Sequence, residues 1–417
     1  MFFFIIIILI FFLFIYYPLI IRKTLLLLLI LSFVGSIALN PNVSYEGAKL
    51  GVSTWINVVL PALLPFFIGT EMLIELGFVR FIGTLLEPIV KPVFNVPGEG
   101  SFIFLMSTAS GYPMGVKLTS QLREEGLISQ EDGQRLLSFC STSGPLFILG
   151  AVAIGMFQNK SLGLLILVSH YLGALITGFS FRFYKKSKSS NFSSNKVTYS
   201  KKIRASLSHM KNTNNSFGQI FSESVKRGME VLFIIGGYII LFSVLIQIIK
   251  HGNIIEPLTV KIRTIPLLSS LDKKIYTALL SGLIEITVGC RELSSIESLT
   301  FKSQAIFTSF IISWSGLSIH AQSLSIISKT DLNCGIYIFS KIIHSFYSAF
   351  LAFILCSFYP NGLFTSKGVF KSLYEPIFSL NLMEKFKYSF LLFLHFNLIL
   401  LFLGLFFLII SKRIKRV

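Results

Sequence analysis

The sequence has little charge and very few cysteines for its length. Only 13% of its 417 residues are charged and only four are cysteines, whereas soluble domains carry about 25% charged residues. This low charge excludes a water-soluble enzyme. The cysteines form no CxxC motif and no even spacing, so neither a disulfide framework nor a zinc site is indicated. We expect all four to pack as small apolar residues: Cys140, Cys290, Cys334 and Cys356.

Motifs for catalysis are also missing. The chain contains no nucleophile elbow, no phosphate-cradling glycine loop and no HExxH sequence. Its net charge of +18 would suggest nucleic acid in a soluble protein. Here the Lys and Arg residues concentrate in loops and in the tail, where the charge bias of cytoplasmic loops explains them. We therefore predict a protein that is not an enzyme, holds no metal or cofactor and binds no nucleic acid.

Long hydrophobic runs are what the sequence has in abundance. Apolar residues make up 53% of the chain, including 43 Phe, and a helix needs ~20 apolar residues to cross a bilayer. Apolar segments follow one another at about 24–39, 50–77, 135–158, 161–184, 228–250, 303–328, 336–358 and 388–411. Two shorter ones, about 101–122 and 275–296, are interrupted by glycine, proline or charge. We predict an all-α, polytopic membrane protein with about eight or nine transmembrane helices and two re-entrant hairpins.

The first 40 residues are predicted to form N-terminal membrane anchor helices (1–40). Leu25–Leu39 resembles a signal-peptide core, but the many later spans favour an uncleaved first helix. Residues 1–21 are either an additional span or an upstream extension from a misassigned start.

Charge sets the predicted orientation. The longest polar stretch, 185–227, holds ten Lys or Arg against one acid, Glu223, which predicts a cytoplasmic loop. Alternating the spans outward from that loop lets the segment at 101–122 enter the membrane from the cytoplasm and the segment at 275–296 enter from outside. Residues 359–417 are then an outer loop and a C-terminal helix with a basic tail on the cytoplasmic side.

Four Ser-Gly steps occupy matched places, at 110–111, 143–144, 281–282 and 315–316. Each half of the chain reads as a long helix, a hairpin and an interrupted helix, so we predict two inverted repeats, 45–184 and 228–358. Breaking a helix frees backbone groups that are tolerated in a membrane only where they line a cavity or pack on protein. Matched interrupted segments in two halves point to the binding site of a transporter.

The candidate substrate-binding residues lie at these four breaks or beside them. Lys117 and Arg291 would neutralise carboxylates, and Glu285 would orient the substrate or carry a coupling proton. Alternatively, both cations snorkel to the interface, Glu285 pairs with Arg291, and the small residues only permit close helix packing. The candidates are Ser110, Gly111, Tyr112, Lys117, Ser141, Ser143, Gly144, Glu285, Arg291, Ser313, Ser315, Gly316, Ser318 and His320.

Other ionisable residues in apolar segments leave alternatives. Glu71 and Glu75, one helical turn apart, either form a proton site or pair with Arg80 near the interface. His320 either bonds a substrate or packs as a satisfied side chain. For the isolated histidines we expect packing: His170, His344 and His395.

Several long strings resemble a known family. ASGYPMGVKLTSQLREEG, RLLSFCSTSGPLFILGAVAIGMF, GLIEITVGCREL and SGLSIHAQSLSIIS are similar to the YlbJ family of sporulation integral membrane proteins, which carries the nucleoside-recognition (Gate) domain. The resemblance covers about residues 45–358. It implies a multi-pass protein of the cell membrane or outer forespore membrane in a spore-forming Firmicute. It also implies delivery of dipicolinic acid, a small aromatic dicarboxylate, towards the spore.

The same domain is similar to that of concentrative nucleoside transporters, in which two opposed hairpins and two unwound helices form the site. The first hairpin departs from them, because Tyr112-Pro113-Met114-Gly115 holds no acid or amide and Lys117 follows. We therefore predict a secondary transporter of a small anionic solute, dipicolinate first of all, with H⁺ or Na⁺ as candidate coupling ion. Membrane lipid is an expected partner and a homo-oligomer a candidate assembly. The alternatives are a transporter of nucleosides or other small metabolites, and a non-transporting scaffold for spore-envelope assembly.

Overall fold

The computed structural model describes residues 18–185, 199–211, 216–253, 257, 259–260 and 272–357. Within these residues every regular element is a helix. Five helical segments are long and apolar enough to cross a membrane: Pro41–Glu75, Lys160–Phe181, Phe217–His251, Phe301–Ile327 and Cys334–Ser357. The protein is therefore an all-helical polytopic membrane protein, as predicted. The expected span at 388–411, the basic tail, His395 and residues 1–17 lie outside the described residues.

The elements of the first half run from the N-terminal helix to the basic segment. In chain order they are α2 (Pro18–Leu39), α3 (Pro41–Thr54), the π-helix η1 (Trp55–Val59), α4 (Leu60–Glu75), α5 (Phe78–Phe94), α6 (Glu99–Ser110), α7 (Met114–Glu124), α8 (Gln130–Phe139), the π-helix η2 (Phe147–Met156) and α9 (Lys160–Phe181). The predicted broken helix at 135–158 is two helical pieces, α8 and η2, separated by a non-helical stretch.

The second half repeats this order of elements. It contains α10 (Tyr199–Lys211), α11 (Phe217–His251), α13 (Lys273–Ile284), α14 (Ile286–Ser294), α15 (Phe301–Trp314), α16 (Gly316–Ile327) and α17 (Cys334–Ser357). Each half therefore has a long helical segment, a pair of short helices, a broken helix and a final uninterrupted helix.

Local sequence decides where several helices begin. The side chains of Ser129, Asn159 and Thr300 each accept a hydrogen bond from a backbone N–H in the first turn of α8, α9 and α15. At α11, Ser216 and Gln219 form a reciprocal capping box. With this cap, α11 begins at Phe217, eleven residues before the start of the apolar segment at 228–250 from which the helix was predicted.

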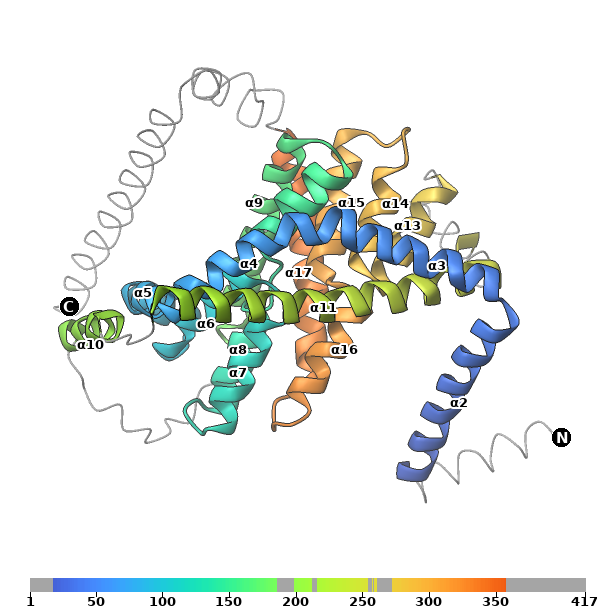
Figure 1. Cartoon of the computed structure of the whole chain (residues 1–417). Helices are drawn as coiled ribbons and strands as arrows, with labels where there is room; N and C mark the ends of the chain where they lie inside the picture. Colours follow the sequence, from blue (N-terminus) through green and yellow to red (C-terminus); the bar gives the residue numbers. More distant parts are fainter. Residues whose placement is uncertain are drawn as a thin grey trace.

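Two long helical segments cross the molecule side by side. In the view of Figure 1, α3, α4 and α11 run across the middle, with α7, α8 and α16 below them and α14 and α15 above. The absence of a side chain at Gly51 permits this close approach, since a Cβ there would lie 2.8 Å from the Ile240 Cα. Elsewhere in the fold, α17 packs against both α9 and α15.

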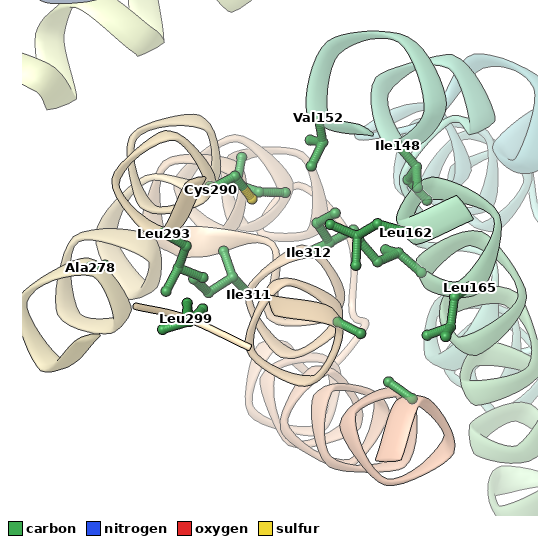
Figure 2. Close-up of a cluster of buried hydrophobic side chains, with 14 of the residues drawn as sticks. Ile148, Val152, Leu162, Leu165, Ala278, Cys290, Leu293, Leu299, Ile311 and Ile312 are labelled. Carbon is green, nitrogen blue, oxygen red and sulfur yellow. The ribbon is translucent and has the colours of Figure 1, made fainter. Parts of the chain in front are cut away.

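One hydrophobic core joins the two halves. Figure 2 shows side chains of η2 and α9 packed against those of α14 and α15. The labelled residues include Ile148, Val152, Leu162, Leu165, Cys290, Leu293, Ile311 and Ile312. All four cysteines carry free thiols, and three of them are buried. Because residues of both halves share this core, the helix breaks on its border lie close to one another in this structure.

Candidate functional site

The two helix breaks of the first half touch each other. Between the end of α6 at Ser110 and the start of α7 at Met114, Gly111 adopts a φ of 76° and a ψ of −164°. This conformation is essentially restricted to glycine. A Cβ on Gly111 would lie 2.6 Å from the backbone nitrogen of Gly144, which belongs to the break between α8 and η2.

The second half brings its two breaks together in the same way. Glu285 separates α13 from α14 in an extended conformation, and its carboxylate accepts a 2.7 Å hydrogen bond from the Val288 N–H. Ser315 and Gly316 separate α15 from α16 with φ values of 74° and 75°. A Cβ on Gly316 would lie 3.1 Å from the Ile284 carbonyl oxygen, so these breaks are also in contact.

Side chains satisfy the backbone groups that the breaks set free. Tyr112 Oη donates to the Ile312 carbonyl at 3.1 Å, and Trp314 Nε1 donates to the Leu283 carbonyl at 3.0 Å. Tyr171 Oη donates to the Ser143 carbonyl at 2.8 Å, and Ser107 Oγ donates to the Cys140 carbonyl. Since an unpaired buried carbonyl is costly, these bonds explain how interrupted helices persist inside the fold.

A cavity of about 680 Å³, counting space open to its surroundings, lies where the breaks meet. Much of its wall is apolar and comes from α4 and α11, including Phe67 and Ile239. Its polar side comes from the helix breaks of both halves. Seven of the predicted residues line it: Ser110, Gly111, Tyr112, Ser143, Gly144, Glu285 and Ser318.

A second cavity of about 770 Å³ adjoins the first. The two share wall residues from three helices and one helix break, namely Phe67, Ser110, Tyr112, Ile235 and Gln322. Lys117 and Glu71 line this second space. Of the two predicted cations, Lys117 is therefore the one that faces a cavity.

Arg291 lies elsewhere and lines neither cavity. Its Nη1 donates to Thr54 Oγ1 at 2.8 Å and to the Leu50 carbonyl at 3.4 Å, so it ties α14 to α3. It does not pair with Glu285, whose carboxylate caps α14 instead. The alternative of a Glu285–Arg291 ion pair is wrong, because the two side chains point to different neighbours.

The remaining predicted residues sit behind the cavity wall and line neither space. Ser141 Oγ lies 3.2 Å from Tyr337 Oη, Ser315 Oγ donates to the Trp314 carbonyl, and Ser313 and Gly316 are buried in the break between α15 and α16. His320 is 3% exposed, and its ring centroid lies 4.3 Å from that of Trp314. Within the described part of the chain neither of its ring nitrogens has a close hydrogen-bond partner.

The acidic pair on α4 has a different partner from the expected one. Arg227 Nη1 lies 2.5 Å from Glu75 and 3.9 Å from Glu71. The expected pairing with Arg80 is wrong, because α11 runs along α4 and brings an arginine that is distant in sequence to this site.

Two histidines for which we expected packing lie close to the helix breaks and form hydrogen bonds there. His170 Nε2 accepts the Ser143 N–H at 3.0 Å, and its Nδ1 lies 2.8 Å from Ser313 Oγ. His344 Nε2 donates to the His170 carbonyl at 2.9 Å. Both histidines are fully buried, so the expected packing is confirmed, and the hydrogen bonds add partners that the sequence had not indicated.

Sequence reasoning missed the residue at the centre of this cluster. Lys341, on α17, is fully buried. Its Nζ donates to the Ser141 carbonyl at 2.8 Å and to Tyr112 Oη at 3.1 Å, and lies 3.1 Å from His344 Nδ1. An ionisable residue inside an apolar span is by default a candidate functional residue, and applying this rule to 336–358 would have found it.

A polar contact on the surface joins the loops of the two halves. Arg123 makes a two-pronged ion pair with Asp331, with both N–O distances 2.8 Å, and the hydrogen bond from this guanidinium lowers the pKa of Asp331. Gln134 also exchanges hydrogen bonds with the backbone of Asn333. These contacts tie the turn between α7 and α8 to the turn between α16 and α17.

Comparison with known proteins places the chain in a family. The Gate family model, described as nucleoside recognition, matches residues 56–160. No solved structure matches. An uncharacterized protein of Alkalihalophilus pseudofirmus is 26% identical over 124 residues, which is 28% of this chain and 27% of that protein. The sporulation integral membrane protein YlbJ of Bacillus subtilis is 38% identical over 330 residues, 78% of this chain and 80% of that protein. The chain therefore belongs to the YlbJ family of sporulation integral membrane proteins and carries a Gate domain.

Proposed function

We propose that this protein is a secondary transporter that moves a small anionic solute across the membrane around the developing spore. Dipicolinic acid is the substrate that the family resemblance implies. The observation that carries the proposal is a cavity lined by three helix breaks, two from the first half and one from the second, and by the first turns of α16 that follow the fourth break. Broken helices at one shared cavity are the arrangement by which transporters expose backbone groups to a solute.

The packing of the halves supports alternating access. The second helix of each short pair packs on the second piece of the other half's broken helix, since α7 contacts α16 and α14 contacts η2. Two repeats related by inversion would make matching contacts of this kind. In this proposal the α6–α7 pair enters from the cytoplasm and the α13–α14 pair from outside, within eight or nine spans. Rocking of one repeat against the other would open the cavity to each side in turn.

One cation and several hydroxyls could bind an anion in these cavities, although the carboxylates of Glu285 and Glu71 also line them. Lys117 in the adjoining cavity would attract carboxylates, and the hydroxyls of Ser110, Ser143 and Ser318 would donate hydrogen bonds to them. Glu285 would orient the solute or take up a coupling proton. Arg291 is left out of the proposed site, because its guanidinium faces α3.

A second candidate function, nucleoside transport, has one observation in its favour. The first cavity is largely apolar and holds a carboxylate, a combination that could bind a ring and a sugar hydroxyl, and the matching family is described as nucleoside recognition. A non-transporting scaffold is the third reading, and it requires no solute cavity.

Purified protein in liposomes distinguishes these functions. We expect uptake of labelled dipicolinate, little competition by nucleosides, and loss of at least 90% of uptake in Lys117→Met. Lys49→Met is the matched control, because Lys49 is exposed on α3 and, among the residues that the structure describes, forms an ion pair only with Glu46. Competition by nucleosides would favour the second function. Unchanged uptake in Lys117→Met would remove Lys117 from the site, and no uptake of either solute would favour a scaffold.

A further inference from the structure

Lys341 has only neutral hydrogen-bond partners in the described part of the chain. Three neutral acceptors face its Nζ: the Ser141 carbonyl, Tyr112 Oη and His344 Nδ1. His344 Nδ1 is an acceptor because its other nitrogen must carry the proton that it donates to the His170 carbonyl. Tyr112 likewise points its proton at the Ile312 carbonyl and turns a lone pair to the lysine. An ammonium has three protons for these three acceptors.

The same three atoms could serve as part of the coordination of a small cation. Backbone carbonyls set free at helix breaks are the usual ligands of a coupling ion in transporters, and the Ser141 carbonyl is such a group. A hydroxyl oxygen from the other break of the first half and an imidazole nitrogen complete the set. None of these ligands is a carboxylate, and in the described part of the chain Lys341 has no acidic partner within ion-pair distance.

We infer that the Lys341 ammonium fills a monovalent-cation site made by the freed Ser141 carbonyl, Tyr112 and His344, so that the lysine takes the place that a sodium ion could otherwise occupy. The inference rests on the proposed function in one respect only. Its consequence, transport without sodium, requires that the protein is a transporter. Tyr112 forms the wall between this charge and the first cavity. A buried charge without a counter-ion is unfavourable, so an anion in that cavity would supply the missing charge and would be preferred over a neutral solute.

Thermal unfolding of the full-length protein in detergent tests the site without any transport measurement. Lys341→Ala removes the ammonium and leaves its three acceptors facing an empty space. We expect the unfolding midpoint of this variant to rise by about 3 °C or more when sodium chloride replaces choline chloride, because an ion that binds only the folded state stabilises it. The wild-type midpoint should be the same in both salts.

Lys341→Met is the matched control, because its side chain fills much of the same space without a charge. This variant should show no sodium-specific shift. If Lys341→Ala does not accumulate, Lys341→Ser replaces it, since its hydroxyl adds an oxygen ligand to the vacated site. Methylammonium chloride should stabilise the alanine or serine variant as sodium does.

A sodium-specific shift in the wild type would overturn the inference, and so would an alanine or serine variant that responds to neither sodium nor methylammonium. These results are independent of transport. A sodium-responsive variant together with a wild type that transports no solute would retain the cation site and reject the proposed function.

Discussion

Replacing Gly111 by alanine tests how closely the two breaks of the first half must approach. Gly111 has a φ of 76° and a ψ of −164°, and forcing a residue with a side chain into such a conformation costs about 1–3 kcal/mol. The added Cβ would also lie 2.6 Å from the backbone nitrogen of Gly144. Overpacking of this kind typically costs a further 1–3 kcal/mol. We therefore expect Gly111→Ala to destabilise the protein by about 2–6 kcal/mol.

Two other glycines separate the cost of backbone strain from the cost of the added Cβ. Gly126 also has a positive φ, 68°, but no atom lies within 4 Å of a Cβ there, so Gly126→Ala should cost only the conformational strain of about 1–2 kcal/mol. Gly69 is helical and equally open, so Gly69→Ala should be neutral or stabilising by up to about 1 kcal/mol.

The assay is equilibrium unfolding of the three purified variants in the same detergent, with dipicolinate uptake measured in parallel. Stability should fall in the order Gly69→Ala, Gly126→Ala, Gly111→Ala, and uptake should be lost in Gly111→Ala alone. If Gly111→Ala were no less stable than Gly126→Ala, the contact between the two breaks would not be needed, and the reasoning would be refuted.

Three further predictions follow from the site and its border. Glu285→Gln should keep the cap of α14, because an amide oxygen can accept the Val288 N–H, while uptake driven by a pH gradient falls at least tenfold; unchanged uptake would remove Glu285 from coupling. Arg291→Ala should leave the KM for dipicolinate within twofold and lower the unfolding midpoint, and a large rise in KM would place Arg291 in the site after all. The pKa of Asp331 is lowered in the folded protein. Its ion pair with Arg123 therefore stabilises the fold fully at pH values above the ordinary carboxyl pKa. That stabilisation is lost as the pH falls through the lowered pKa. Asp331 is half exposed, so this stabilisation should be below about 1 kcal/mol. Asp331→Asn should remove the pH dependence of stability in this range. A pH dependence that persists in this variant would belong to another group.

The helix breaks could be predicted because their signals are local. The segment that holds Gly111 and Pro113 cannot continue as a regular helix. In the structure α6 ends at Ser110 and α7 begins at Met114. Likewise α15 ends at Trp314, directly before the predicted Ser-Gly step at 315–316. In the second half the break falls at Glu285, three residues after the Ser-Gly step, where the carboxylate starts a new helix.

Partners from distant segments could not be predicted from local patterns. Arg227 reaches Glu75 because α11 lies along α4, and no spacing along the chain encodes that pairing. Lys341 and His170 lie 171 positions apart in apolar spans, and only the packing of α17 on α9 brings them to the same break. Hydropathy predicts that such spans exist, while side-chain packing decides which neighbour each ionisable residue meets.

Protection of introduced cysteines by the solute tests most directly whether the breaks of both halves form one transport site. Ser110 and Ser318 come from different halves and line the same cavity, so each is replaced by cysteine in a background without the four native cysteines. In sealed vesicles of known orientation, we predict that a water-soluble thiol reagent labels both positions and that saturating dipicolinate slows both reactions at least fivefold. Labelling that dipicolinate leaves unchanged at either position would contradict a single shared site.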